Sequence, residues 1–323
     1  MAPVSRDRAQ LLLVGGLVVA VGLVGLAIVL NSGIYTHNLA SRADPIASEA
    51  AGHTAVVRDS VGGLVEFAVR QHPDREGEQV HNVTAGVSNV SDLLAREAAG
   101  RAVLTNATVA ATTNGTKVNQ TAETGDRAFT SAAVDYDWEV VTGAEGIRAF
   151  RMDVQRTSLD DHAGVTFGDF TGDEFNVTFA PSSGDDWNVS VYRDSGTDTT
   201  IVTVTNVDTG RSFGPCTDDT GSRTEIDVTD ATVAGEPCDA LRRLDALATP
   251  FDLEFHNAGE AEGSYGLVVV DALNVDDANL ADAGDPGPSE LDTLYSVDVV
   301  VRFRSQRVDF QTTITVAPGE LDG

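Results

Sequence analysis

The chain has 323 residues, and its 50 Asp and Glu against 21 Lys and Arg give a formal net charge of −29. Lys117 is the single lysine, so arginine carries almost all of the positive charge. An acidic surface with almost no lysine is typical of proteins adapted to high salt, where solvated carboxylates maintain solubility and salt screens their repulsion. The same charge argues against nucleic acid and against an anionic membrane face as partners.

The first predicted element is a membrane span. Residues Leu11–Leu30 are uncharged and mostly aliphatic, and a helix of this length matches a bilayer core of about 30 Å. No small-residue cleavage site follows this run, which indicates a retained anchor rather than a removable secretory signal. Arg6 and Arg8 precede the run and only Arg42 follows it closely, which predicts a cytoplasmic N-terminus. We therefore expect a cytoplasmic leader over 1–10, a transmembrane helix over 11–30, and a single-pass protein of the cell membrane with its C-terminal domain extracellular.

A helical stalk is predicted over residues 31–105. Asp44 and Pro45 are typical of a helix start, and apolar residues follow at helical spacing until His72 and Pro73 end the helix. A second helical patch covers Ser91–Leu104, with Ser91 as its N-cap. Residues 106–127 are rich in Thr, Asn and Gly and are predicted to form a loop.

From residue 128 the sequence period changes, which predicts a β-rich extracellular domain over 128–323. Short stretches rich in Val, Thr, Ile and aromatic residues alternate in polarity between turn clusters, and this pattern favours an antiparallel β-sandwich. One helix, Cys238–Ala248, is expected among them. The predicted fold class is α+β: an N-terminal transmembrane helix and helical stalk followed by an antiparallel β-sandwich-like domain. The expected strands are Ala133–Val141, Gly146–Val154, Glu174–Phe179, Trp187–Tyr192, Thr199–Asn206, Phe251–Phe255, Tyr265–Ala272, Leu294–Arg304 and Val308–Val316.

Cys216 and Cys238 are the only cysteines, and in an extracellular domain an even count indicates one disulfide bond. The bond would close a loop of about 23 residues and would contribute about 3 kcal/mol in the entropic model. Two free thiols or a metal-binding pair are the alternatives, although no His or further Cys lies nearby at ligand spacing.

Asparagine sequons also indicate an extracellular location. Seven of the thirteen Asn residues lie in Asn-x-Ser/Thr, where about two would be expected by chance. Five of them fall between residues 82 and 119, which predicts an exposed, glycosylated region. A Thr-rich composition without modification is the alternative. The predicted glycosylation sites are Asn82, Asn89, Asn106, Asn114, Asn119, Asn176 and Asn188.

The sequence contains no familiar catalytic motif: it has no G-x-S-x-G, no H-E-x-x-H, no phosphate-binding glycine loop and no C-x-x-C. Asp161 and His162 are adjacent in a predicted loop, and adjacent residues seldom converge on one site. The acidic turn Asp169–Glu174 could supply oxygen ligands to Ca²⁺, but solvated turn carboxylates are favoured in so acidic a chain. Trp138 and Trp187 are expected in the core. We therefore expect a non-enzymatic protein without catalytic residues, cofactor or metal.

The start of the chain carries the most informative motif. Arg8-Ala9-Gln10-Leu11, directly before the apolar run, resembles a class III (prepilin-type) archaeal signal peptide. The residues after the run, Tyr35–Arg42, are similar to the same stretch in haloarchaeal pilin-like surface proteins. The resemblance implies that a prepilin-type peptidase cuts between Ala9 and Gln10 and leaves the apolar helix on the mature protein. It also implies a type IV pilin-like plan, in which identical N-terminal helices pack together in a filament.

Two main hypotheses therefore stand, and an enzyme with an unrecognised site is the third. The first is a pilin-like filament or adhesion subunit on the surface of a halophilic archaeon, with the lipid bilayer, the peptidase and other copies of the chain as partners. The second is a monomeric, single-pass anchored envelope or binding protein with no filament role. Cleavage at Ala9 distinguishes them, because only the first hypothesis requires it.

Overall fold

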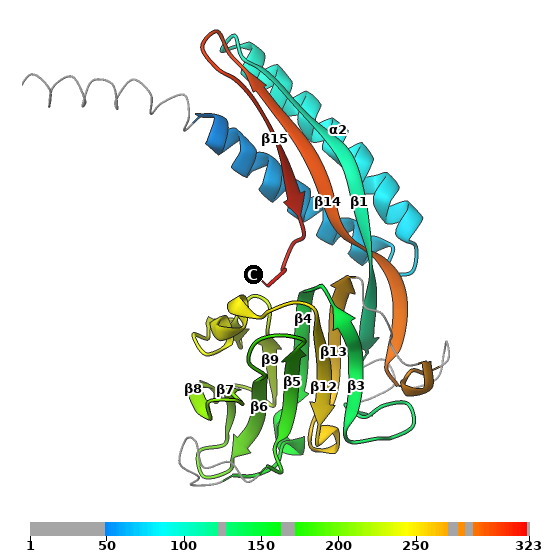
Figure 1. Cartoon of the computed structure of the whole chain (residues 1–323), viewed down its shortest axis with the longest axis vertical. Helices are drawn as coiled ribbons and strands as arrows, with labels where there is room; N and C mark the ends of the chain where they lie inside the picture. Colours follow the sequence, from blue (N-terminus) through cyan, green and yellow to red (C-terminus); the bar gives the residue numbers. More distant parts are fainter. Residues whose placement is uncertain (1–48, 122–126, 163–171, 271–276, 282–286, 322–323) are drawn as a thin grey trace, which may run out of the picture.

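Two antiparallel sheets make up most of the described structure. The computed structural model describes residues 49–121, 127–162, 172–270, 277–281 and 287–321. Figure 1 shows two parts: a head of two packed sheets, and an arm in which helices cover an extension of the larger sheet. The predicted leader over 1–10, the predicted transmembrane helix over 11–30 and the predicted cleavage site at Ala9 and Gln10 lie outside the described residues.

The smaller sheet forms one layer of the head, with its strands in the order β3-β12-β5-β6-β7-β8. Alternating polarity decides which face is buried: in β12, Phe251, Leu253 and Phe255 are buried, and the residues between them are half-buried. The strands are β3 (Trp138–Ala144), β5 (Phe175–Pro181), β6 (Trp187–Asp194), β7 (Thr199–Asn206), β8 (Arg211–Asp218) and β12 (Phe251–His256).

The larger sheet runs in the order β11-β10-β9-β4-β13-β1-β14-β15, and β2 also pairs with β13. Through β4 and β13 it forms the second layer of the head, and through β1, β14 and β15 it continues into the arm (Figure 1). Its strands are β1 (Leu104–Gln120), β2 (Arg127–Ala128), β4 (Gly146–Gln155), β9 (Arg223–Asp227), β10 (Thr232–Val233), β11 (Glu236–Pro237), β13 (Glu262–Val270), β14 (Ser289–Arg304) and β15 (Asp309–Val316). Short 3-10 helices connect them: η2 (Arg156–Ser158), η3 (Leu241–Ala246), η4 (Ala258–Glu260) and η5 (Asp277–Asn279).

An aromatic cluster fills the space between the two sheets of the head. The Phe255 ring lies 5.1 Å from Tyr265 of β13 and 5.4 Å from Phe175 of β5, both in edge-on geometry. Trp138 of β3 packs edge-on against Phe255 at 5.7 Å, and its indole nitrogen donates a hydrogen bond to the Phe129 carbonyl. Edge-on pairs add to the stabilisation that burial provides, so this cluster is the centre of the head.

The arm is a two-layer structure of helices on strands. Its first helix occupies residues 49–71, and α2 (Glu76–Ala99) returns antiparallel to it (Figure 1). Valines recur every four residues on the inner faces of both helices, which brings them to one side. They pack on valines of β14 and β15 to form a second core: Val57, Val61, Val65, Val83, Val87, Val297, Val299, Val301 and Val316.

Two buried polar side chains of α2 fix the helix to the strands. The Gln79 Oε1 atom accepts hydrogen bonds from the Leu294 amide (2.8 Å) and the Thr293 hydroxyl (3.1 Å) of β14. The Ser91 hydroxyl accepts from the Ala107 amide of β1 (2.9 Å). Both contacts satisfy strand amides that the helix layer covers, so they determine where α2 sits along the sheet.

The predicted α+β fold class is wrong. Strand accounts for 47% of the structure and helix for 25%, and the helices described from residue 49 onward form no separate stalk. The first helix and α2 lie on β1, β14 and β15, because a valine face on a helix must be buried and distant strands supply the partner. Among the described residues, no helix is long and apolar enough to cross a membrane.

Element boundaries differ from the prediction around the arm. The second helix begins at Glu76 rather than Ser91, and the stretch predicted to be a loop over 106–127 is mostly the seventeen-residue strand β1. β1 consists mainly of Thr, Ala and Asn residues, many of them exposed, so its sequence lacks the apolar alternation that predicts a strand. Thr nevertheless favours strands, and β14 pairs with β1 along most of its length. Cys238–Ala248 contains only the 3-10 turn η3. The strands predicted at β4, β5, β6, β7, β12, β14 and β15 are confirmed within a few residues.

Candidate functional site

A cleft of about 530 Å³ opens between the arm and the head. Its walls come from the first helix, the turn after β9, η3 and the segment that follows β15. The pKa of Asp230 on one wall is raised by burial and by the neighbouring Asp227 carboxylate, and Arg151 offsets part of this rise. The lining carries side chains of both charges. Its charged residues are Arg58, Asp59, Asp230, Arg242, Asp245 and Glu320.

Behind this cleft, the buried residue Arg148 joins the head to the arm. Its Nη2 atom donates to the Leu294 carbonyl of β14, and its guanidinium lies 5.7 Å from the centre of the Tyr295 ring. Burial lowers the pKa of Arg148 to about 10, although Tyr295, Glu66 and Glu320 favour its charged form. The Tyr295 hydroxyl donates to Glu320 Oε1 at 2.6 Å, and burial together with this bond raises the pKa of Tyr295. These contacts fix the segment that follows β15, at Glu320, between the head and the arm, and we call this region the joint.

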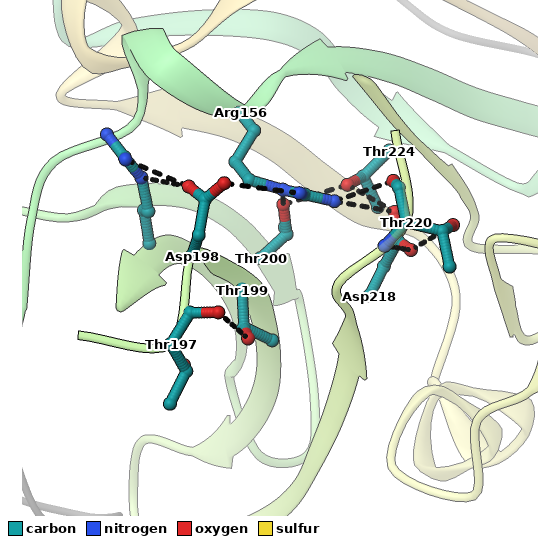
Figure 2. Close-up of polar contacts among 9 residues, drawn as sticks. Arg156, Thr197, Asp198, Thr199, Thr200, Asp218, Thr220 and Thr224 are labelled. Carbon is teal, nitrogen blue, oxygen red and sulfur yellow. Dashed lines mark hydrogen bonds and ion pairs between the residues drawn. The ribbon is translucent and has the colours of Figure 1, made fainter. Parts of the chain in front are cut away.

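A second buried arginine, Arg156, connects η2 to two strands of the head, β7 and β8, and to the loop that follows β8. Figure 2 shows its guanidinium between Thr200 of β7, Asp218 of β8 and the Thr220 carbonyl. Asp218 also accepts hydrogen bonds from the Thr220 amide and hydroxyl and from Thr224. Burial would raise the pKa of Asp218, but these hydrogen bonds and the Arg156 charge hold it below its ordinary value. Through Thr224 of β9, the network connects the larger sheet to β7 and β8 of the smaller sheet.

The predicted disulfide bond between Cys216 and Cys238 is confirmed. It links β8 to the segment that precedes η3, and the described residues contain no free cysteine. Next to it, the guanidinium groups of Arg211 and Arg243 lie 4.8 and 4.5 Å from the Phe213 ring centre. Contacts of a guanidinium with an aromatic face are attractive, so the two arginines help to hold the Phe213 ring in place.

The seven predicted glycosylation sites differ in exposure. Asn89, Asn106 and Asn114 are exposed, and Asn82 and Asn188 are half-buried. Asn119 and Asn176 are each only 7% exposed. The Asn176 amide donates to the Glu174 carbonyl (2.8 Å) and accepts from the Asn188 amide (3.0 Å), so it is part of the interior. Modification of these residues remains a prediction. Asn89 and Asn114 are its best candidates, because the exposed Asn106 accepts a hydrogen bond from the Ser91 hydroxyl (3.1 Å).

Asp161 and His162 do not face each other. Asp161 Oδ1 accepts from the Ser195 amide, whereas the His162 Nε2 atom lies 2.9 Å from Asp160 Oδ2. His162 is buried and packs edge-on against the Tyr192 ring. Within the residues that the structure describes, no group of three or more His, Cys, Asp or Glu could hold a metal ion. Of the acidic turn considered for Ca²⁺, residues 169–171 lie outside the described residues.

Both tryptophans contribute to the core, as predicted. Trp138 is buried, and Trp187 is half-buried against the Phe213 ring at 6.1 Å. The sequence did not reveal the buried arginines Arg148 and Arg156 or the cleft. Arg148 is buried because the C-terminal segment pairs with it at Glu320 and the Tyr295 ring lies against its guanidinium. The next residue, Ala149, has a positive φ of 53°.

These observations define a β-rich protein in which a helix-covered arm projects from a two-sheet, disulfide-bonded head. The chain belongs to a family of unknown function, DUF7261, whose model matches residues 5–168. The matched range includes both arm helices, β1 and the first strands of the head. No similar protein was found among curated proteins, and none was found among solved structures.

Proposed function

We propose that this protein is a non-enzymatic surface protein of a halophilic archaeon, held at the cell membrane by its N-terminal apolar segment and processed like a type IV pilin. One observation carries the proposal. Ala50, near the first described residue, packs with Ala98, Val103 and Phe303 at the end of the arm that lies farthest from the head. The N-terminal segment, which includes residues 11–30, therefore leads into one end of an elongated molecule.

This arrangement supports an anchored subunit. An apolar segment attached at one pole can occupy a bilayer, or pack with identical segments in a filament, while the head projects away from it (Figure 1). The disulfide bond and the exposed sequons of the arm support an extracellular location. The acidic composition supports a protein that stays soluble in high salt.

Mass spectrometry of the mature N-terminus tests the processing step. We expect the mature chain to begin at Gln10, because Arg8-Ala9-Gln10 sits directly before the apolar run, where the peptidase acts. Ala9→Leu should leave a precursor about nine residues heavier and prevent assembly, and Ala2→Leu serves as a control outside the motif. A wild-type chain that begins at Met1 or Ala2 in cells with active peptidase would contradict pilin-like processing and leave a plain anchored protein.

Protease treatment of intact cells tests the location. We expect added protease to remove the head and arm from intact cells and to leave cytoplasmic proteins untouched. Protection of the head until the cells are permeabilised would contradict an extracellular domain, whatever the state of the N-terminus.

A further inference from the structure

The arm tip combines exposed positive charge with an exposed leucine. We define the arm tip as residues 302–310 of the β14–β15 hairpin together with Leu104, which pairs with Arg304 at the start of β1. Arg302, Arg304 and Arg307 are all exposed. Three arginines within six residues are unusual in a chain with 21 basic residues among 323. Leu104 is 69% exposed, the highest value among the exposed large apolar residues.

The arginines of the arm tip keep much of their charge available. Arg304 lies 3.7 Å from Asp309, the one acidic residue of the hairpin tip. Among the described residues, Arg302 and Arg307 form no ion pair with a carboxylate. Nearby, Arg101 lies 3.8 Å from Glu49 and 3.3 Å from Glu97, so it balances the acids at the adjoining helix ends. A protein of net charge −29 thus has a locally basic end.

The arm tip is also firmly supported. Phe303 is buried beneath it against Ala50, Ala98 and Val103, and Val308 and Phe310 pack on the same cluster. The hairpin is therefore fixed to the ends of both helices. A side chain that projects from such a support loses less conformational freedom on binding than one on a loose loop.

We propose that the arm tip binds phosphate headgroups of the outer face of the membrane, with Leu104 inserted at the level of the acyl boundary. Guanidinium groups match phosphate oxygens with paired hydrogen bonds, and a basic cluster beside an exposed leucine is typical of an interfacial contact. High salt screens long-range attraction, but hydrogen-bonded contact pairs persist because the partners lie within a few ångströms. The overall acidic charge would then turn the rest of the body away from the bilayer.

The position of the arm tip supports this partner over others. The described chain begins at residue 49 beside the tip, and residues 31–48 connect it to the apolar run 11–30. Even fully extended, that connection spans at most about 60 Å, so the anchor keeps the tip near the bilayer. The inference rests on the proposed function, since without an anchor nothing would hold the tip at a membrane.

Trypsin cleavage of the full chain tests the contact. The full chain is reconstituted into vesicles of phosphatidylcholine and phosphatidylglycerol, or kept in maltoside micelles, which lack phosphate. The rate of cleavage after Arg307, in the hairpin turn, is compared with the rate after Arg75, in the exposed turn between the helices at the other end of the arm. We expect the Arg307-to-Arg75 ratio to fall at least fivefold in vesicles.

Variants separate phosphate recognition from simple proximity. Arg302→Gln with Arg304→Gln keeps the Arg307 cleavage site and should return the ratio to its micelle value. Arg211→Gln with Arg242→Gln, on the head, is the matched control and should leave the protection intact. Circular dichroism of each variant confirms that the fold is kept. Protection that survives Arg302→Gln with Arg304→Gln would overturn the inference, because the tether alone would then explain it.

Two further outcomes are distinguishable. A chain that floats with vesicles but shows the same cleavage ratio as in micelles overturns the inference and leaves the anchor standing. A chain that does not float with vesicles overturns the anchor, and the inference falls with it. Inorganic phosphate added to the micelles should give no protection, since protection by free phosphate would identify a soluble-anion site in place of a bilayer contact.

Discussion

The arm and the head use one continuous sheet but stabilise it in different ways. In the head, β4 and β13 face a second sheet across Phe129, Phe175, Phe255 and Tyr265. In the arm, β14 and β15 face two helices across a layer made mostly of valine. The head has a disulfide bond and a buried ion pair, whereas the arm depends on side chains such as Gln79 that satisfy strand amides.

The change from one region to the other occurs along β1. Among the described residues, Leu104–Gly115 pair with β14 alone, and Thr116–Asn119 lie between β14 and β13. A Cβ atom at Gly115 would lie 2.5 Å from the Val269 carbonyl oxygen, so only glycine allows this close approach. Because the two cores are separate clusters on either side of this crossing, a change in one region should leave the other folded.

The largest effect is expected from the aromatic centre of the head. Phe255→Ala removes a ring that contacts Trp138, Phe129, Phe175 and Tyr265, and it should lower the free energy of unfolding by about 4 kcal/mol through lost burial and the remaining cavity. Urea denaturation measures the change. Val207→Ala, at a site that is 51% exposed, is the control and should change stability little. If Phe255→Ala lowers the free energy of unfolding no more than Val207→Ala does, the aromatic cluster is not the centre of the head.

The buried ion pair of the head should give the next largest effect. Asp218→Asn removes the buried carboxylate beside Arg156 and should cost about 3 kcal/mol at pH 7, because the buried guanidinium then keeps only the exposed Asp198, 4.0 Å away, as an acidic partner among the described residues. The folded pKa of Asp218 is lowered, so its contribution is complete above its unfolded pKa, about 4, and is lost as the pH falls through the folded value. The difference between wild type and variant should therefore shrink in strongly acidic solution.

Denaturation series at pH 7 and below pH 4 measure this difference. Asp239→Asn is the matched control, since the Asp239 side chain is 98% exposed and pairs loosely with Arg242 at 3.7 Å. If the difference in unfolding free energy between wild type and Asp218→Asn is the same at both pH values, the Asp218 charge does not stabilise the head.

A smaller and more local effect is expected in the arm. Gln79→Leu removes the acceptor of the Leu294 amide and the donor to the His72 carbonyl (2.6 Å), which should cost about 2 kcal/mol because buried groups lose their partners. Hydrogen exchange should accelerate at Leu294 and along α2, while Val189 in the head stays protected. Gln71→Leu, at the exposed end of the first helix, is the control. Equal acceleration in both regions would mean that arm and head unfold as one unit.

Many strands of both regions could be predicted from the sequence, but β1 in the arm and β8 and β9 in the head could not. Strands such as Thr199–Asn206 combine alternating polarity with clear turn signals, and β7 has the same bounds. In the arm, the first helix was predicted from its valine spacing, but its partner strands lie more than two hundred residues further along the chain. Local periodicity indicates that a face is buried and does not identify the partner that buries it.

The polar sites depend on tertiary structure even more. Gln79 and Ser91 gain their roles only when α2 lies across β14 and β1, and Arg148 is buried only when Tyr295 and the C-terminal segment cover it. The disulfide bond was predictable because only two cysteines are present. The arginines of the arm tip are visible in the sequence as a short cluster, but their position beside residue 49 requires the fold.

The smallest expected effects come from two buried tyrosines, and they should have opposite signs. Tyr295 at the joint donates to Glu320, so Tyr295→Phe should cost about 1 kcal/mol of unfolding free energy. The Tyr265 hydroxyl in the head is buried and has no hydrogen-bond partner among the described residues. Tyr265→Phe removes that unsatisfied group while keeping the ring, so it should stabilise the protein by about 1 kcal/mol.

The pH dependence of these two variants provides a second measurement. Burial raises the pKa of both hydroxyls, so each tyrosine contributes stability that is complete below its unfolded pKa, about 10, and is lost as the pH rises further. Both variants should therefore lose less stability than wild type between pH 9 and pH 11. Because the two substitutions are chemically identical, opposite signs at pH 7 can come only from the surroundings of each hydroxyl. If Tyr265→Phe destabilises the protein, the Tyr265 hydroxyl must have a hydrogen-bond partner. The two tyrosines would then not differ in whether their hydroxyls are satisfied.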